Sequence, residues 1–464
     1  MQKKELVNNF MLTAIVVKGT INNVKRSLQD MYEQLSETGS LFALISSEYS
    51  GDGDVLQDFT DIIEAGICRG YEYVNTIVAP TKNKQVYSII DNVLYIVWFV
   101  KDKNKMYFDK DAIREKHIWK DIEWGKRKKN YNPKGKDPGN VWIPTVDDGK
   151  GKIVKHVFMG TNDIVNRLLS ATKHGKSLVL LDDDKENIIN ENSTCLLGAK
   201  KKHPASSKCT GDIFFGTAEN MDKIKNSSVD LFVTSPPYWD LKDYYKEGQI
   251  GKEPYDEYLK RINKVWAECK KKLKTSGSLW ININIRVRAN APVLLPKDIA
   301  AQCKNLGFCY KGIIIWHKSS GIPTHKNNIV DRHEYVLVFA KSDKSRINLS
   351  ALESFSDYIN TDISGGAFWN INRKAGSVGK KYIHPAIYPN ELVDRIIKCC
   401  TNPMDTVADP FVGSGTTLIS ALKNGRNFVG YEYNEGFGEL MEFRFGNEIA
   451  DLCGNVNFHS TTKK

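Results

Sequence analysis

Two short segments carry residues whose types and spacing could support chemistry, and the first is Val229–Trp239. It predicts an apolar strand that stops abruptly at Ser235, Pro236, Pro237 and Tyr238. Because proline fixes φ, lacks an amide hydrogen and restricts the residue before it, this turn is expected to be rigid. Such a turn can direct the Ser235 hydroxyl and the Pro236 carbonyl at one point, with the Tyr238 ring alongside to stack on a planar ligand. Taken alone, an ordinary strand-terminating loop explains these four residues better.

The second segment, Val407–Thr417, predicts a strand that ends in a glycine-rich turn, followed by a helix over Leu418–Gly425. Glycines there let the backbone approach a ligand closely, and the helix start suits a polar or anionic ligand group. An acidic side chain about 20 residues into such a unit commonly holds ribose hydroxyls, and Glu432 in the next strand is suitably placed. A lone GxG is usually only a tight turn, but the full unit is specific for an adenosine-containing cofactor. The candidate cofactor-binding residues are Asp409, Pro410, Phe411, Gly413, Ser414, Gly415, Thr416 and Glu432.

Together the two segments resemble the (D/N/S)PP(Y/F/W) catalytic motif and the FxGxG cofactor motif of the amino-methyltransferases of DNA. The order, with the catalytic motif first, is that of the beta class, and the resemblance extends from about Gly211 to Glu439. Thr217 departs from the family pattern, which often has an acidic residue after the glycine, so adenine-ring recognition does not carry over to this position. The other segments that carry the resemblance are Gly248–Gly251, Ile313–Lys318, Glu334–Lys341, Gly366–Trp369 and His384–Ala386, and His384 is a further candidate cofactor-binding residue.

The resemblance implies a Rossmann-like α/β sheet in the C-terminal half and S-adenosyl-L-methionine as the methyl donor. An exocyclic amine of the target base would attack the sulfonium methyl in line, so positioning and desolvation are the main tasks of the enzyme. Ser235 and the Pro236 carbonyl would accept hydrogen bonds from the amine, and Tyr238 would stack on a base flipped out of double-stranded DNA. This chemistry requires the proline turn and the glycine turn to face each other across one pocket.

The residue types also bear on which atom is methylated. A covalent route to carbon 5 of cytosine needs a nucleophilic cysteine, but the sequence has no Pro-Cys pair, and Cys399 and Cys400 are expected to be core residues of a helix. Family usage associates serine in the first motif position with cytosine N4 and aspartate with adenine N6. Cytosine N4 is therefore favoured, and adenine N6 is the alternative. Protein-glutamine methylation, which usually shows NPPY, fits less well. A non-catalytic DNA-binding module on the same fold is an alternative of another class.

Several segments recur in the same order at nearly constant separation, which predicts a duplicated α/β domain. The ungapped alignment of the clearest pair sets Asn162 opposite Asn390 and Arg167 opposite Arg395. General similarity among α/β proteins explains the first two pairs better than the fourth. The four pairs are Glu37–Phe42 with Thr275–Trp280, Asp91–Lys101 with Asp331–Lys341, Trp142 with Trp369, and His156–Leu168 with His384–Ile396.

The two copies diverge where chemistry is expected. The alignment sets Leu181–Asn187 opposite Asp409–Gly415, so the first copy lacks the glycines, and it has no counterpart of Thr234–Tyr238. We expect a degenerate methyltransferase-like α/β domain over residues 1–184, a linker over 185–209 and a catalytic domain over 210–464. Because beta-class enzymes often pair as dimers, the degenerate copy is predicted to replace the second subunit, as an internal pseudo-dimer within a monomer, and to help hold DNA.

The charge balance favours a polyanionic partner. Lys and Arg outnumber Asp and Glu by 66 to 55, a net charge of +11, although a solvated lysine-rich surface is a common cause of such a surplus. The loop over residues 124–136 interleaves cations with aromatics in a way that suits phosphates and bases, and a solvated basic loop explains it equally well. Its candidate DNA contacts are Lys126, Arg127, Lys128, Lys129 and Tyr131.

Composition also speaks against several classes of protein. The nine cysteines are scattered and form no CxxC pair, so neither a metal site nor a disulfide framework is expected, and a reducing cytoplasm fits. No signal peptide is visible, and the most apolar run, Tyr87–Val100, is too short to span a bilayer. The expected setting is the cytoplasm of a prokaryote or phage-infected cell, at the nucleoid, and the resemblance allows a companion restriction endonuclease.

Overall fold

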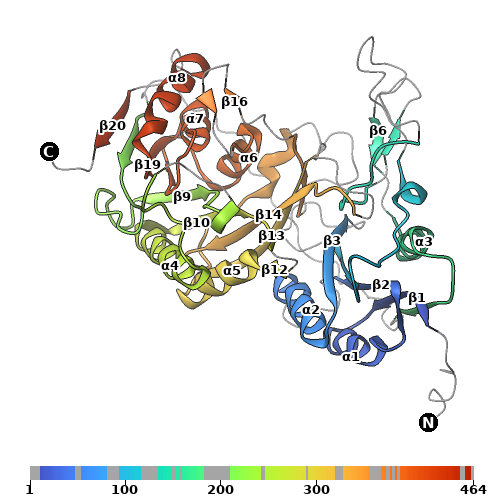
Figure 1. The fold of residues 1–464 in the computed structure, drawn as a ribbon. Helices are drawn as coiled ribbons and strands as arrows, with labels where there is room; N and C mark the ends of the chain where they lie inside the picture. The colour runs from blue at the N-terminus through green and yellow to red at the C-terminus, as the bar shows by residue number, and fades with distance from the viewer. Residues whose placement is uncertain are drawn as a thin grey trace.

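The computed structural model shows two α/β halves, the N-terminal one in blue to teal and the C-terminal one in green to red (Figure 1). The described residues are 11–46, 54–80, 93–115, 134–143, 145–147, 153–156, 159–181, 209–241, 246–288, 291–318, 328–354, 367–372, 377–378, 382–383, 387–449 and 455–460. Among these residues no helix is both long enough and apolar enough to cross a membrane.

The C-terminal half is built on a nine-stranded sheet in the order β15-β13-β14-β10-β9-β18-β19-β8-β20. From β10 to β20 all neighbouring strands are parallel, whereas β14 is antiparallel to both β10 and β13. β9 is buried along its whole length, as expected for a parallel strand covered on both faces. The strands are β8 (Gly211–Phe215), β9 (Val229–Thr234), β10 (Leu273–Ile283), β13 (Cys309–His317), β14 (His333–Ala340), β15 (Phe368–Asn370), β18 (Thr406–Asp409), β19 (Asn427–Glu432) and β20 (Val456–Ser460).

Helices pack on both faces of this sheet, because successive residues of a strand point to opposite faces. On one face Ile281 of β10 shares a core with Trp266 of α4. On the other face Trp280 shares a core with Ile396 of α6 and Leu418 of α7. The helices of this half are α4 (Tyr255–Lys272), α5 (Leu295–Asn305), α6 (Asn390–Cys400), α7 (Thr416–Lys423) and α8 (Gly438–Glu448).

The N-terminal half carries a five-stranded sheet in the order β3-β4-β2-β1-β7. β2, β1 and β7 are parallel, and β4 is antiparallel to β2 and β3. Order and direction repeat those of β13-β14-β10-β9-β18, so the predicted duplication is confirmed. The elements are β1 (Leu12–Lys18), α1 (Ile21–Met31), β2 (Leu35–Ile45), α2 (Val55–Arg69), β3 (Glu72–Pro80), β4 (Val93–Val100), α3 (Thr161–Ala171) and β7 (Ser177–Leu181).

Short elements complete the two halves. They are the strand pairs β5 (Thr145–Asp147) with β6 (Ile153–His156), β11 (Arg286–Arg288) with β12 (Ala291–Val293), and β16 (Ser377–Val378) with β17 (Tyr382–Ile383), and the 3-10 turns η2 (Lys110–Ile113), η4 (Trp239–Leu241), η5 (Leu349–Ser354) and η7 (Glu435–Phe437).

One packing detail recurs in both copies at residues that the alignment had paired. The buried Trp142 ring lies 5.0 Å from the guanidinium carbon of Arg167, and the buried Trp369 ring lies 5.7 Å from that of Arg395. Each arginine comes from the equivalent helix, α3 or α6. A cation over a tryptophan face is a specific contact, so its presence twice is unexpected for unrelated domains.

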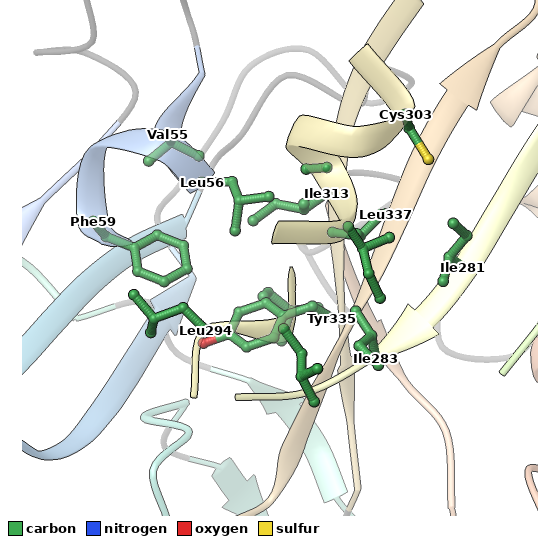
Figure 2. Packing of buried hydrophobic residues seen from close by; sticks show 14 of the residues in the cluster. Val55, Leu56, Phe59, Ile281, Ile283, Leu294, Cys303, Ile313, Tyr335 and Leu337 are labelled. Atoms are coloured by element: carbon green, nitrogen blue, oxygen red, sulfur yellow. The ribbon is translucent and has the colours of Figure 1, made fainter. Parts of the chain in front are cut away.

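The halves meet through α2 and α5, which are equivalent because each follows the long central strand of its sheet. Phe59 of α2 stacks on Tyr335 of β14, with ring centroids 5.8 Å apart. Figure 2 shows Val55 and Leu56 of α2 on the same side as Leu294, and all these residues belong to one buried cluster. A single apolar core therefore runs across the junction.

Ion pairs flank this core. Lys297 of α5 pairs with Asp61, at 3.1 Å, and with Glu64, both on α2. Lys304, near the other end of α5, pairs with Asp54 at the start of α2. A junction in which equivalent elements of two copies face each other has the geometry of a two-fold dimer interface.

Candidate active site

The proline turn and the glycine turn lie together at one edge of the nine-stranded sheet. β9 and β18 are parallel neighbours, with Leu231 opposite Val407 and Phe232 opposite Ala408, so the turns that follow them leave from the same edge. Open α/β sheets bind ligands outside the carboxyl ends of their strands. A cavity of about 830 Å³, its mouth included, lies here and is lined from both turns. The predicted single pocket is therefore confirmed.

The predicted site residues fall into three groups. Those that line the cavity are Ser235, Pro237, Pro410, Phe411, Gly413, Ser414, Thr416 and Glu432. Those next to lining residues in the chain, but not themselves part of the lining, are Pro236, Tyr238, Asp409 and Gly415. Those outside the described residues are His384, Lys126, Arg127, Lys128, Lys129 and Tyr131.

The serine turn is held by α4 and by a glycine. The fully buried Tyr258 of α4 donates its hydroxyl hydrogen to the Pro237 carbonyl at 2.8 Å. Gly251 has a φ of 107°, and a Cβ on it would lie 2.8 Å from the Trp239 carbonyl oxygen. Glycine is the residue that tolerates both conditions. The carbonyl of Pro237, two residues after the serine, is thus fixed before any ligand arrives.

Tyr258→Phe tests this support. The substitution leaves the Pro237 carbonyl without its hydroxyl partner, so we expect the free energy of unfolding to fall by about 1 kcal/mol. We also expect a several-fold lower methylation rate, because the unsupported residue lines the cavity. Denaturant unfolding and a methyl-transfer assay measure the two effects. Tyr107→Phe, at a tyrosine that is 45% exposed, is the matched control, and equal stability of the two variants would contradict the prediction.

Tyr238 is held at its hydroxyl end. The hydroxyl donates to Oε2 of Glu334 at 2.8 Å and accepts from Nδ2 of Asn282 at 2.9 Å. Nζ of Lys318 donates to the other oxygen of Glu334 at 3.0 Å, so the carboxylate is paired as well as hydrogen-bonded. Residues from β10 and β14, with Lys318 just after β13, therefore set the position of the ring.

The glycine turn owes both of its glycines to backbone conformation. Gly413 and Gly415 have φ values of 54° and 79°, in the left-handed region. Gly415 also caps the start of α7, where an added Cβ would lie 3.2 Å from Met441. The fully buried Arg444 of α8 donates to the Ser414 carbonyl at 2.8 Å and to Oγ1 of Thr416 at 3.0 Å. The turn is therefore rigid as well as open to the cavity.

Asp409 joins the two turns from within the sheet. Its Oδ1 accepts the Thr234 hydroxyl at 2.7 Å and the Phe411 amide at 2.9 Å. Its Oδ2 accepts the hydroxyls of Thr417 at 2.6 Å and Tyr388 at 3.1 Å. The residue is 1% exposed, and burial raises the pKa of its carboxyl group. The geometry favours a positioning role, because Thr234 directly precedes the serine turn and Phe411 opens the glycine turn.

Glu432 ends β19 on the wall of the cavity. Its Oε2 accepts the Gly413 amide at 2.7 Å and its Oε1 accepts the Asn434 amide at 2.8 Å. The side chain is nearly buried, and burial raises its pKa to about 7. A carboxylate oxygen can accept more than one hydrogen bond, so each oxygen can still bind a ligand hydroxyl.

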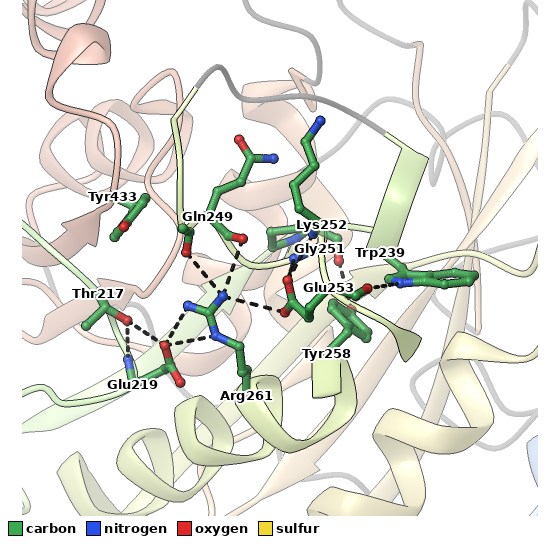
Figure 3. Close-up of polar contacts among 12 residues, drawn as sticks. Thr217, Glu219, Trp239, Gln249, Gly251, Lys252, Glu253, Tyr258, Arg261 and Tyr433 are labelled. Carbon is green, nitrogen blue, oxygen red and sulfur yellow. Dashed lines mark hydrogen bonds and ion pairs between the residues drawn. The ribbon is translucent and has the colours of Figure 1, made fainter. Parts of the chain in front are cut away.

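Arg261 of α4 joins three segments of the cavity wall (Figure 3). It donates to Oε2 of Glu219 at 2.7 Å and to the Gly248 carbonyl at 3.1 Å. Glu219 also accepts the Thr217 hydroxyl at 3.1 Å. Thr217, which departs from the family pattern, thus has an acidic group within hydrogen-bond distance, although that acid is already paired with the arginine.

Three residues of the site were not predicted. Tyr388 lines the cavity four positions after His384, within a segment already linked to the cofactor strand, so its aromatic ring was a usable signal. Arg261 and Arg444 lie on helices that carry other charged residues. Nothing in the sequence separates them from solvated cations, because their partners come from other elements.

A mostly parallel sheet with two such turns around one cavity has the architecture of an S-adenosylmethionine-dependent methyltransferase. The sequence matches the DNA methylase family model, named for N6 and N4 methyltransferases, over residues 17–206 and 229–443. This match spans both halves and most of the chain. The protein belongs to the DNA methylase family and is a DNA amino-methyltransferase that uses S-adenosyl-L-methionine.

Two curated relatives and one solved structure illustrate the similarity. Type II methyltransferase M.XycI of Xanthomonas campestris pv. cyanopsidis is 32% identical over 50% of this chain and 85% of its own length. DNA adenine methyltransferase YhdJ of Escherichia coli K12 is 30% identical over 47% of this chain and 76% of its own. The DNA modification methylase TTHA0409 of Thermus thermophilus, solved with S-adenosyl-L-methionine, is 25% identical with a TM-score of 0.41, covering 55% of this chain and 100% of that one.

Proposed function

We propose that this protein methylates the exocyclic N4 amine of cytosine at specific sites in double-stranded DNA. The observation that carries the proposal is that Ser235 and the glycine turn line one cavity. An amine reacts well only when it is held close to the methyl donor with its lone pair aligned, and a hydroxyl beside the donor pocket can provide that hold. Serine in the first motif position favours cytosine among the two amines.

The lining residues fit S-adenosyl-L-methionine. Glu432 offers carboxylate oxygens to a ribose diol, and the glycine turn at the start of α7 offers a polar edge to the amino-acid part. Ile250 and Phe411 add apolar surface to the same wall. The bound cofactor supplies an electrophilic methyl group on a sulfonium.

The protein's own residues position the target base in this proposal. Ser235 and the Pro236 carbonyl accept hydrogen bonds from the amine, which leaves the nitrogen lone pair free to react. Tyr238 stacks on the base after it has been flipped out of the duplex. Because Glu334 and Asn282 already hold the tyrosine hydroxyl, little side-chain entropy is lost when the base arrives.

A cysteine nucleophile finds no support in the part of the chain that the structure describes. Cys269, Cys303, Cys399 and Cys400 are buried, and burial raises the pKa of each thiol. The described cysteines do not line the cavity. Since the thiolate is the reactive form, these residues are poor nucleophiles, which supports direct attack by an amine.

Adenine N6 is the second candidate. The relative named a DNA adenine methyltransferase favours it, and both amines present the same N–H groups to the serine turn. Nucleoside mass spectrometry of DNA from cells that express the protein separates the two. We expect N4-methylcytosine, and long-read sequencing of the same DNA gives the site. N6-methyladenine would contradict the choice of base, and DNA without any methylated amine would contradict catalysis. Calorimetry with S-adenosyl-L-methionine then tests for a non-catalytic module.

Glu432 should make the stability of the ligand-free protein depend on pH. Because burial raises its pKa from 4.5 to about 7, the folded protein holds this proton more tightly than the unfolded chain. The resulting stabilisation is on the order of 3 kcal/mol, is fully present below about pH 4.5 and is lost as the pH rises through about 7. Urea unfolding at about pH 5 and about pH 8 should show wild type losing stability relative to Glu432→Gln. A difference that does not change with pH would contradict the prediction.

We also propose that the N-terminal half serves as a built-in partner subunit, with boundaries at 1–184, 185–209 and 210–464. The junction of the equivalent helices α2 and α5 supports this, and sedimentation should give a monomer. In the proposal the basic loop of this half contacts DNA phosphates. Replacing Lys126, Arg127, Lys128 and Lys129 by glutamine should weaken DNA binding and reduce the salt slope by about 0.9 for each lost contact. Unchanged affinity and slope would exclude the loop.

The relatives named Type II methyltransferases support a restriction-modification setting. We therefore propose a companion restriction endonuclease that cuts the unmethylated site, and a location at the nucleoid of a prokaryotic or phage-infected cell. Digestion of methylated and unmethylated DNA by an extract of the source cells tests this setting.

A further inference from the structure

A second cavity lies at the junction of the two halves, away from the two turns. It has a volume of about 790 Å³, its mouth included, which is within the range of ligand pockets. Asn75 and Asn140 line it from the N-terminal half, and Asn284, Asp331 and His333 line it from the C-terminal half. Neither half alone would form it.

His333 is a buried polar group on the wall of this cavity. The residue is 2% exposed, and neither ring nitrogen has a hydrogen-bond partner among the described residues. Burial lowers its pKa to about 4, so the ring is neutral at physiological pH and carries one donor and one acceptor. Leaving such a group unsatisfied is costly, and a ligand that bonds to it would recover that cost.

Asp331 is held in place by amides from both halves. Nδ2 of Asn140 donates to its Oδ1 at 3.0 Å, and Nδ2 of Asn284 donates to its Oδ2 at 3.1 Å. Asn140 also donates to Oδ1 of Asn75 at 3.1 Å. The nearby cation Arg286 lies 3.7 Å from the carboxylate of Asp240. A fixed carboxylate disfavours a phosphate and favours a ligand with N–H donors, such as the amino edge of a nucleobase.

The cavity adjoins the residues that hold Tyr238. Asn284 lies two residues beyond Asn282, and His333 directly precedes Glu334, while both Asn282 and Glu334 bond to the Tyr238 hydroxyl. DNA that delivers a base to Ser235 therefore passes close to this cavity. We propose that it binds a second base of the DNA site, one with an exposed amino group, and that Asp331 and His333 determine the specificity at that position. This inference rests on the proposed function.

The test compares methylation of a randomised DNA pool by wild type, Asp331→Asn and His333→Phe. Sequencing of the methylated molecules gives the base preference at each position around the target. The first variant replaces an acceptor by a donor, and the second removes both ring nitrogens at nearly constant volume. We expect each to reduce the preference at one same position about tenfold, with unchanged preference elsewhere. Affinity for S-adenosyl-L-methionine should stay at the wild-type value.

Asp343→Asn, at an acid whose side chain is 92% exposed, is the matched control and should leave the profile unchanged. If both folded variants give the wild-type profile, or if they lower methylation equally for all sequences, the cavity does not read a base. If Asp331→Asn fails to fold, His333→Phe alone decides, because it replaces an unsatisfied polar ring by an apolar one. A pool that wild type leaves unmethylated would contradict the proposed function instead.

Discussion

Ser235→Ala is expected to lower kcat by about 100-fold or more, the scale seen when one preorganised hydrogen-bonding group is removed from an active site. The hydroxyl lines the cavity and is the acceptor that we assign to the target amine. Without it the amine loses a contact that strengthens as positive charge develops on nitrogen. Affinity for S-adenosyl-L-methionine should change little, because the glycine turn and Glu432 remain.

Single-turnover methylation and calorimetry separate these two effects. Ser170→Ala, on the exposed face of α3, is the matched control and should behave as wild type. A Ser235→Ala protein with normal kcat would remove serine from the reaction, and one with normal kcat but weaker cofactor binding would reassign it to the cofactor.

Asp409→Ala is expected to have the largest combined effect on stability and activity. The change leaves the hydroxyls of Thr234, Thr417 and Tyr388 and the amide of Phe411 without their buried acceptor. Unsatisfied buried groups cost about 1–3 kcal/mol each, but hydroxyls can reorient, so we expect a loss of about 3 kcal/mol in the free energy of unfolding. Both turns are released at once, so kcat and cofactor affinity should fall together.

The appropriate comparison is Asp222→Ala, at an acid whose side chain is 58% exposed. Denaturant unfolding, calorimetry and the methylation assay are applied to both variants. If Asp409→Ala loses stability but binds the cofactor and reacts normally, Asp409 supports only the sheet. If it retains stability and loses only cofactor affinity, the residue contacts the cofactor directly.

The sequence was sufficient to predict the two turns and the duplication because both depend on local chemistry. Proline restricts the chain wherever it stands, glycine at positive φ is a backbone requirement, and a repeated pattern needs no contact map. The buried Trp142 and Trp369 could likewise be paired by position alone. These features are set by residues near one another in the chain.

The remainder depends on contacts between distant segments. Asp409 was predicted as a cofactor ligand from its place beside the glycine turn, yet its side chain bonds to Thr234, 175 positions earlier. The cavity around His333 needs residues of both halves, so no single motif could reveal it. Arg261 becomes informative only when the Gly248 carbonyl lies against it.

The ion pairs between α2 and α5 have a consequence for how molecules of this protein associate. α2 presents Asp54, Asp61 and Glu64 to the junction, and α5 presents Lys297 and Lys304. Had each half faced an identical half across a symmetry axis, acid would have met acid and lysine would have met lysine, at an unfavourable Coulomb energy. The two copies have therefore become mutually exclusive mates. Each recognises its opposite and repels its own kind, which keeps the molecule at one reactive centre.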